Sequence, residues 1–100
     1  MLCVQGLVSI ENKMLTMDLG EVRECIIEIS SNNDEVFTIR NATYVFTKDD
    51  ETISTGDCSI KDHELYAVIE PTSAGVHRLI YTYEIGNERL IDKIWINVKG

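Results

Sequence analysis

Short runs of alternating apolar and polar residues follow one another along this chain and are separated by polar turns. The clearest alternation lies around Ile27, where Cys25, Ile27 and Ile29 fall on one face of an extended segment and glutamates fall on the other. This period of two is typical of a strand with one buried and one solvated side. Polar turns recur about every 8–12 residues, a spacing that favours an antiparallel sandwich or barrel.

The same pattern predicts about seven to nine strands and no helix. The candidate segments are residues 3–10, 14–17, 22–30, 36–39, 42–48, 52–55, 58–60, 64–70, 76–85 and 89–98. The last two flank Gly86-Asn87-Glu88, where glycine and asparagine accept the positive φ of a tight hairpin. Gly56 and Asp57 are expected to end the strand that begins at Thr52, because both residue types disfavour extended structure.

Composition strengthens the all-β prediction. The chain holds 29 valines, isoleucines and threonines against 10 alanines and leucines. Branching at Cβ restricts χ1 and suits a pleated sheet better than a helix, so we expect a single all-β domain over residues 1–100 that is stabilised by an apolar core. Its inward side chains are predicted to be those of Ile27, Ile29, Tyr44, Phe46, Leu65, Ile69, Leu79, Tyr81, Ile94 and Ile96.

The net charge and the lengths of the apolar runs limit which kinds of partner the chain can bind. The chain carries 17 acidic and 9 basic side chains, which give a formal net charge of −8. Nucleic-acid binding relies on lysine and arginine to neutralise phosphates, so we do not expect nucleic acid as a partner. No stretch approaches the roughly 20 apolar residues that a membrane-spanning helix needs, so we expect no membrane insertion. No sequence pattern indicates a small-molecule substrate.

Three cysteines, Cys3, Cys25 and Cys58, show neither a CxxC spacing nor a cysteine–histidine spacing typical of zinc. The first residues lack the basic start and the sustained apolar run of a signal peptide. We therefore expect a protein that is made in the cytoplasm and has reduced, mostly buried thiols. A disulfide between Cys25 and Cys58 is the alternative.

The sequence offers no complete catalytic or metal-binding pattern. His63 is expected in a solvated turn, whereas His77 begins a strand and is expected to pack beneath a corner or bond a backbone carbonyl. No nucleophile motif accompanies either histidine, so we predict no catalytic residue and no cofactor. The acidic turns 32–35 and 49–51, with Asp57, lack the spacing of a calcium loop. A calcium site formed by two converging turns is the alternative.

The segment from Pro71 to Tyr81, PTSAGVHRLIY, resembles the corner that leads into the sixth strand of immunoglobulin-like (Ig-like) sandwiches. In that family a tyrosine and a cysteine usually stand where this chain has His77 and Leu79. The chain also lacks the Cys…Trp…Cys core of antibody domains, so it is not an antibody-type domain. The resemblance implies an Ig-like antiparallel β-sandwich.

A wider resemblance covers about residues 37–98. The stretch Asn41–Phe46, then Ser54-Thr55-Gly56, then the corner at 71–75 and a terminal strand look like short Ig-like domains of phage and prophage particles, such as the N-terminal domain of phage baseplate upper proteins. This resemblance implies a non-enzymatic structural or interaction module of a tail or baseplate-like particle, in which the chain would be virion-associated. A bacterial surface Ig-like module that binds glycan or protein is the alternative.

One group of apolar residues is predicted to lie on the surface. The strand phase that buries Leu79 and Tyr81 turns Ile80 outward, and the phase of the last strand turns Ile91 and Trp95 outward. Across an antiparallel pair these three side chains come near one another, and such a patch often marks an assembly surface. We predict that Ile80, Ile91 and Trp95 mediate self-association or docking to a protein partner. The alternative is the opposite phase or a covering loop, since a slip of one residue reverses every side chain.

Overall fold

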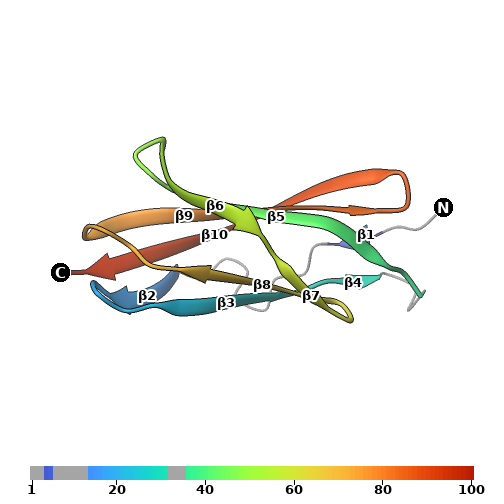
Figure 1. The fold of residues 1–100 in the computed structure, drawn as a ribbon, viewed down its shortest axis with the longest axis horizontal. Helices are drawn as coiled ribbons and strands as arrows, with labels where there is room; N and C mark the ends of the chain where they lie inside the picture. Colours follow the sequence, from blue (N-terminus) through green and yellow to red (C-terminus); the bar gives the residue numbers. More distant parts are fainter. Residues whose placement is uncertain (1–3, 6–13, 32–35) are drawn as a thin grey trace.

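Two β-sheets face each other in the structure, a computed structural model that describes residues 4–5, 14–31 and 36–100 (Figure 1). The larger sheet holds, in order, β2 (Met14–Asp18), β10 (Glu88–Lys99), β9 (Gly75–Ile85), β5 (Ile39–Lys48) and β6 (Glu51–Asp57). The smaller sheet holds β3 (Arg23–Glu28), β8 (Glu64–Ile69) and β7 (Ser59–Lys61). A pair of two-residue strands, β1 (Val4–Gln5) and β4 (Ser30–Ser31), runs antiparallel.

This arrangement confirms the predicted all-β sandwich. Within the described residues, eight strands of three or more residues build the two sheets, and the chain crosses from the larger to the smaller sheet between β6 and β7 (Figure 1). Neighbouring strands run antiparallel apart from β2 and β10, which run parallel. The predicted hairpin joins β9 to β10 through Gly86 and Asn87, and Gly86 has a φ of 59°, in the region that glycine tolerates best.

Several predicted strand limits differ from the structure. The first predicted strand, residues 3–10, lies outside the described residues except for Val4 and Gln5. Residues 36–38 form no strand, and β5 begins at Ile39. Val36 is 95% exposed and therefore does not belong to the buried face of a strand. The short apolar run at this place was a misleading signal for a strand.

Gly56 does not end β6, because the ring of Tyr44 lies against it. The two residues are cross-strand partners in β5 and β6, and a Cβ built at position 56 would lie 3.1 Å from Cε1 of Tyr44. Because Gly56 has no side chain, the Tyr44 ring can lie directly against the backbone of β6. The strand continues to Asp57. A contact with the neighbouring strand therefore overrides the local turn propensity of glycine.

Strand β5 does not alternate strictly between inward and outward residues. Its pairing with β9 shifts next to Asn41, which has a φ of 53°, and its pairing with β6 shifts directly after Phe46. Irregularities of this kind re-aim the side chains around them. As a result Phe46 is buried as predicted and Tyr44 is only partly buried, whereas Thr47 is buried directly beside Phe46, where strict alternation would turn it outward.

The predicted core residues meet between the sheets. Nine of the ten are buried, and Tyr44 packs against their cluster from a partly buried position. Ile27 and Leu65 from the smaller sheet and Leu79 from the larger sheet have no exposed surface at all. Removal of this apolar surface from water is the main stabilising contribution to the fold.

The hydroxyl of Tyr81 joins the two sheets. It donates a hydrogen bond of 2.8 Å to the carbonyl oxygen of Cys25 in β3, while the Tyr81 side chain is fully buried. A buried hydroxyl and a buried carbonyl both need a partner. One side chain of the larger sheet thus satisfies a backbone acceptor of the smaller sheet and sets how closely the sheets approach at this point.

Cys25 and Cys58 are buried free thiols. Cys25 pairs with Ala67 of β8, and the register of β7 with β8 places Cys58 beside Ala67 on the other side. The two cysteines are therefore two strand spacings apart, roughly 9–10 Å, whereas a disulfide spans a Cα separation of at most about 7 Å. The alternative of a Cys25–Cys58 disulfide is wrong, and Cys3 lies outside the described residues.

Burial changes the proton affinity of several core groups. It raises the pKa of the Cys25 and Cys58 thiols to about 11. Burial also raises the pKa of the Tyr81 and Tyr83 hydroxyls well above the usual value for tyrosine, and for Tyr83 the hydrogen bond to Asp92 adds to this rise. Each of these groups stays neutral in the folded state because a charge in the core would lose its hydration.

We predict that Tyr81→Phe lowers the free energy of unfolding by about 1–2 kcal/mol, because it leaves the Cys25 carbonyl buried without its donor. Urea denaturation measures the change, and the slope with urea should stay the same. Tyr66→Phe is the matched control, since the Tyr66 hydroxyl bonds Glu64 at the surface and its loss should change the stability by less than about 0.5 kcal/mol. Equal losses in the two variants would contradict the role given to Tyr81.

We also predict an alkaline loss of stability. The unfolded chain releases its thiol protons near pH 9, but folded Cys25 and Cys58 hold theirs to about pH 11. Their contribution is therefore fully present below pH 9 and is lost as the pH rises to 11, on the order of 2 kcal/mol per thiol. Urea denaturation at several pH values measures this slope. A variant with Cys25→Ala and Cys58→Ala should show a shallower slope, and an unchanged slope would refute the assignment to the thiols.

Candidate functional site

The outer side of the larger sheet carries the three apolar residues predicted at the surface. In β9, Leu79 and Tyr81 point into the core and are fully buried, so Ile80 lies on the opposite side of the strand. In β10, Ile91 is 58% and Trp95 is 48% exposed. The structure therefore has the predicted strand phase, and no loop of the described chain covers Ile91 or Trp95.

The register of the β9–β10 hairpin brings these side chains together. Ile80 lies directly opposite Lys93, and Ile91 and Trp95 are the two residues of β10 that flank Lys93 on the same side of the sheet. Such diagonal neighbours are about 7–8 Å apart, within reach of long and aromatic side chains. We refer to Ile80, Ile91 and Trp95 as the outer patch. Lys93 stands in its middle.

Arg78 borders the outer patch and lies over the ring of Trp95. It is the cross-strand partner of Trp95, and its guanidinium carbon lies 5.4 Å from the centre of the indole ring, a cation–π distance. Arg78 also forms an ion pair of 3.5 Å with Asp50, which contributes little because the Asp50 side chain is 94% exposed. The strand phase predicted from the sequence also turns Arg78 and Lys93 outward, as the structure has them, although the predicted patch was limited to Ile80, Ile91 and Trp95.

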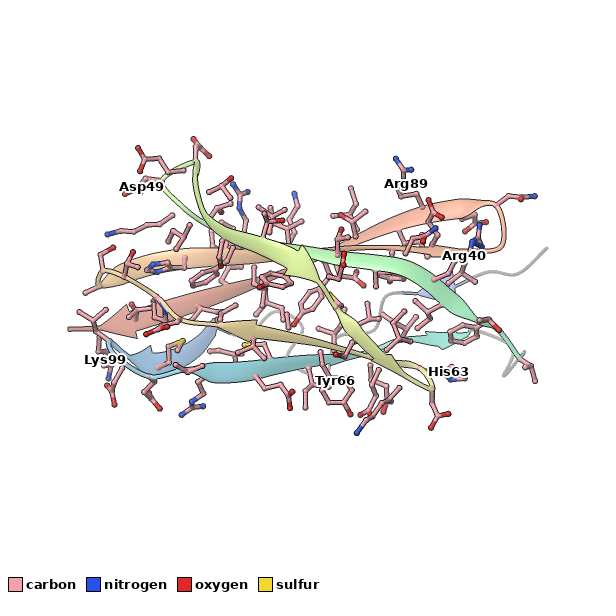
Figure 2. The ribbon with its side chains drawn as sticks, in the orientation of Figure 1. Arg40, Asp49, His63, Tyr66, Arg89 and Lys99 are labelled. Atoms are coloured by element: carbon pink, nitrogen blue, oxygen red, sulfur yellow. The ribbon has the colours of Figure 1, made fainter. Side chains whose placement is uncertain are left out.

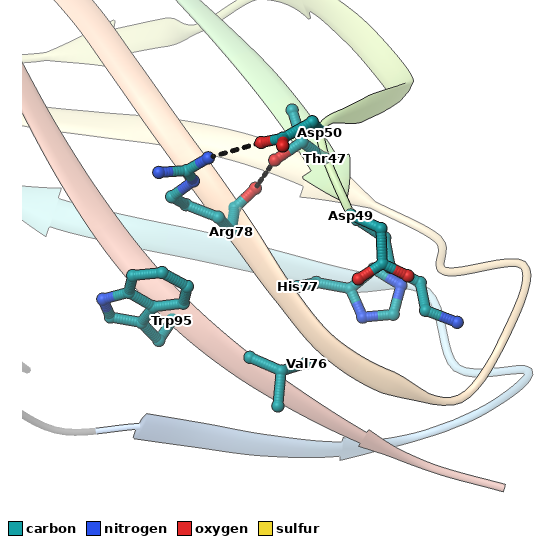
Figure 3. Close-up of a pocket in the computed structure, with 8 residues that line it drawn as sticks. Thr47, Asp49, Asp50, Val76, His77, Arg78 and Trp95 are labelled. Atoms are coloured by element: carbon teal, nitrogen blue, oxygen red, sulfur yellow. Dashed lines mark hydrogen bonds and ion pairs between the residues drawn. The ribbon is translucent and has the colours of Figure 1, made fainter.

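A shallow hollow of about 250 Å³ opens beside Trp95 and is bordered by the β5–β6 turn and the start of β9 (Figure 3). Asp49 and Asp50 form that turn with φ values of 52° and 65°, the positive pair that a two-residue hairpin loop needs. The turn brings Asp50 to Arg78, and Thr47 beneath it donates a hydrogen bond to the Arg78 carbonyl oxygen. The hollow thus combines an aromatic ring with charged groups of both signs.

His77 is a core residue of this end of the sandwich, as the sequence predicted. Its side chain is 1% exposed and stacks on Phe46 with ring centres 5.0 Å apart. Its Nδ1 lies 2.9 Å from the Gly75 carbonyl oxygen, and because a carbonyl can only accept, Nδ1 is the donor. Its Nε2 has no hydrogen-bond partner among the described residues.

His63 departs from the predicted solvated turn. It does lie in the turn between β7 and β8, but it is half-buried and stacks on Phe37 with ring centres 4.0 Å apart. Figure 2 shows His63 at one end of the sandwich and Asp49, which Figure 3 places beside His77, at the other. The two histidines therefore do not come together.

The acidic turns show no metal site where they are described. Residues 32–35 lie outside the described part of the chain. Elsewhere in the described ranges, no three histidine, cysteine, aspartate or glutamate side chains converge as metal ligands. The same ranges contain no helix that is long and apolar enough to cross a membrane.

Comparison with known proteins identifies the fold. No protein-family model and no curated protein matches the chain. The solved structure of titin domain M7 is similar along almost its whole length, with a TM-score of 0.54 over 94% of this chain and 93% of that one, at 14% sequence identity. This chain therefore has an Ig-like β-sandwich fold, as its Pro71–Tyr81 corner predicted. At that identity the likeness shows the fold alone.

Proposed function

We propose that this chain is a non-enzymatic interaction module that joins an assembly through the outer patch. One observation carries the proposal: Ile91 and Trp95 are 58% and 48% exposed on the same side of one strand, beside Ile80 of the next strand. Tryptophan and arginine are enriched at the energetic centres of protein interfaces. Arg78 stacked on Trp95 presents both at once.

The energy for docking comes from the water that leaves the outer patch. Complete burial of a fully exposed isoleucine is worth about 1.5–3 kcal/mol, and Ile91, which is 58% exposed, can gain part of that when a partner covers it. The Arg78 guanidinium favours one orientation of the indole before binding, so less side-chain freedom is lost when a partner covers it. An open sheet face with apolar and cationic side chains suits a broad protein surface better than a small substrate.

As the finer part of this proposal, we place the module in a tail or baseplate-like particle of phage or prophage origin. The support is the resemblance of residues 37–98 to short Ig-like domains of such particles. In that setting the chain would be made in the cytoplasm and become virion-associated, and its partners would be proteins or further copies of itself.

A bacterial surface module for glycan or protein is the second candidate, favoured by the hollow beside Trp95. An aromatic ring next to Asp49, Asp50 and Arg78 offers a stacking surface with hydrogen-bonding groups around it. Titration with simple saccharides distinguishes the two functions. A glycan site should change the fluorescence of Trp95, the single tryptophan of the chain, whereas the assembly function should leave it unchanged by saccharides.

We predict that Ile91→Ser weakens assembly about tenfold, because it removes an apolar side chain from the outer patch. Light scattering measures the mass, and a blue shift of Trp95 emission with rising protein concentration reports burial of the patch. Val22→Ser is the matched control, since Val22 is 60% exposed but lies outside β9 and β10. Assemblies whose mass and emission are the same with Ile91→Ser as with the unchanged chain would rule out the outer patch as the docking surface.

A further inference from the structure

The smaller sheet also carries apolar residues on its outer side, and there they are surrounded by carboxylates. Glu24 pairs with Val68 and Ile26 pairs with Tyr66 across β3 and β8. Ile26 is 40% and Val68 is 52% exposed. We call this surface the acidic face, and it consists of Glu24, Ile26, Glu28, Glu64, Tyr66 and Val68.

The acidic face keeps a negative balance: within β3, β7 and β8, which are described in full, three outward-facing glutamates stand against one outward-facing cation, Lys61. Glu28 and Glu64 are direct cross-strand partners, an arrangement of like charges that destabilises a sheet. Lys61 of β7 lies opposite Glu64 and over the Tyr66 ring at 5.7 Å, and it offsets part of this negative charge. An approaching cation would therefore relieve the repulsion between Glu28 and Glu64.

The outer side of β9 and β10 has the opposite charge although the chain as a whole carries −8. We call it the basic face, and it consists of Arg78, Ile80, Arg89, Ile91, Lys93 and Trp95. Within β9 and β10, which are described in full, Glu84 is the single outward-facing acidic residue. Asn41 and Arg89 already bond its carboxylate and hold its pKa below the usual value.

The two faces match each other. Each has three apolar side chains set among three charges of one sign and one charge of the other, Lys61 on the acidic side and Glu84 on the basic side, so the two faces keep opposite net charges. Figure 2 shows Arg89 and Tyr66 on opposite sides of the sandwich, so one copy presents the basic face in one direction and the acidic face in the other. Complementary charge orients partners during encounter and suppresses contacts between like faces.

We propose that copies of this chain stack front to back, with the basic face of one copy on the acidic face of the next. This inference rests on the proposed function, because the basic face contains the outer patch. A contact between two different surfaces of the same chain is heterologous, and it continues into rings or open stacks instead of stopping at a dimer.

The size of the contact sets its strength. β3 and β8, six residues long and about 4.8 Å apart, give the acidic face a footprint of roughly 200 Å², below the roughly 800 Å² per partner of stable complexes. We therefore expect weak and rapidly reversible association that decreases as salt screens the charges.

The test uses charge reversal on each face separately. Lys93→Glu alters the basic face and Glu24→Lys alters the acidic face, and each should weaken self-association about tenfold or more in sedimentation velocity. Glu51→Lys, in β6 and outside both faces, makes the same charge change as Glu24→Lys and should not. The urea midpoint of every variant checks that the fold is intact.

A mixture of the two variants distinguishes front-to-back stacking from other contacts. The Glu24→Lys chain keeps the basic face and the Lys93→Glu chain keeps the acidic face, so the two should associate with each other although neither associates with itself. If Glu24→Lys leaves association intact while Lys93→Glu and Ile91→Ser abolish it, two basic faces meet, and the stacking is wrong while the proposed function stands. If all three variants associate like the unchanged chain, both proposals fall. A chain that stays monomeric at every concentration also overturns the stacking.

Discussion

The burial of one side of β9 against the smaller sheet is the constraint on which the remaining structure depends. Leu79 and Tyr81 face inward and are fully buried, and the hydrogen bond from Tyr81 to the Cys25 carbonyl aligns β9 with β3 inside the core. A strand has only two faces, so the same burial determines that Arg78 and Ile80 face outward. The proposed docking surface is thus the reverse side of the core.

Much of this fold could be predicted from local pattern. The alternation around Ile27 and along β9 predicted which side chains are buried, because a half-buried strand has apolar residues on its buried face and polar residues on its solvated face. Gly86 and Asn87 predicted the hairpin, since few other residue types adopt the positive φ values of a two-residue turn. The outward positions of Ile80, Ile91 and Trp95 follow from the same alternation.

The features that escaped prediction depend on contacts between strands far apart in the sequence. Gly56 continues a strand because Tyr44 lies against it, and the pairing shifts beside Asn41 and after Phe46 arise from the fit of β5 to two neighbours. The opposite charge of the two outer faces depends on register as well. No local pattern shows that Glu28 lies opposite Glu64.

The position of Ala67 between Cys25 and Cys58 has a consequence for how the molecule is made. Two thiols held apart by an intervening strand cannot become a covalent cross-link by oxidation of the native state. The core is therefore held together by non-covalent contacts at this point. Refolding of the unfolded chain requires no disulfide bond between Cys25 and Cys58. The native state therefore holds both thiols reduced and apart.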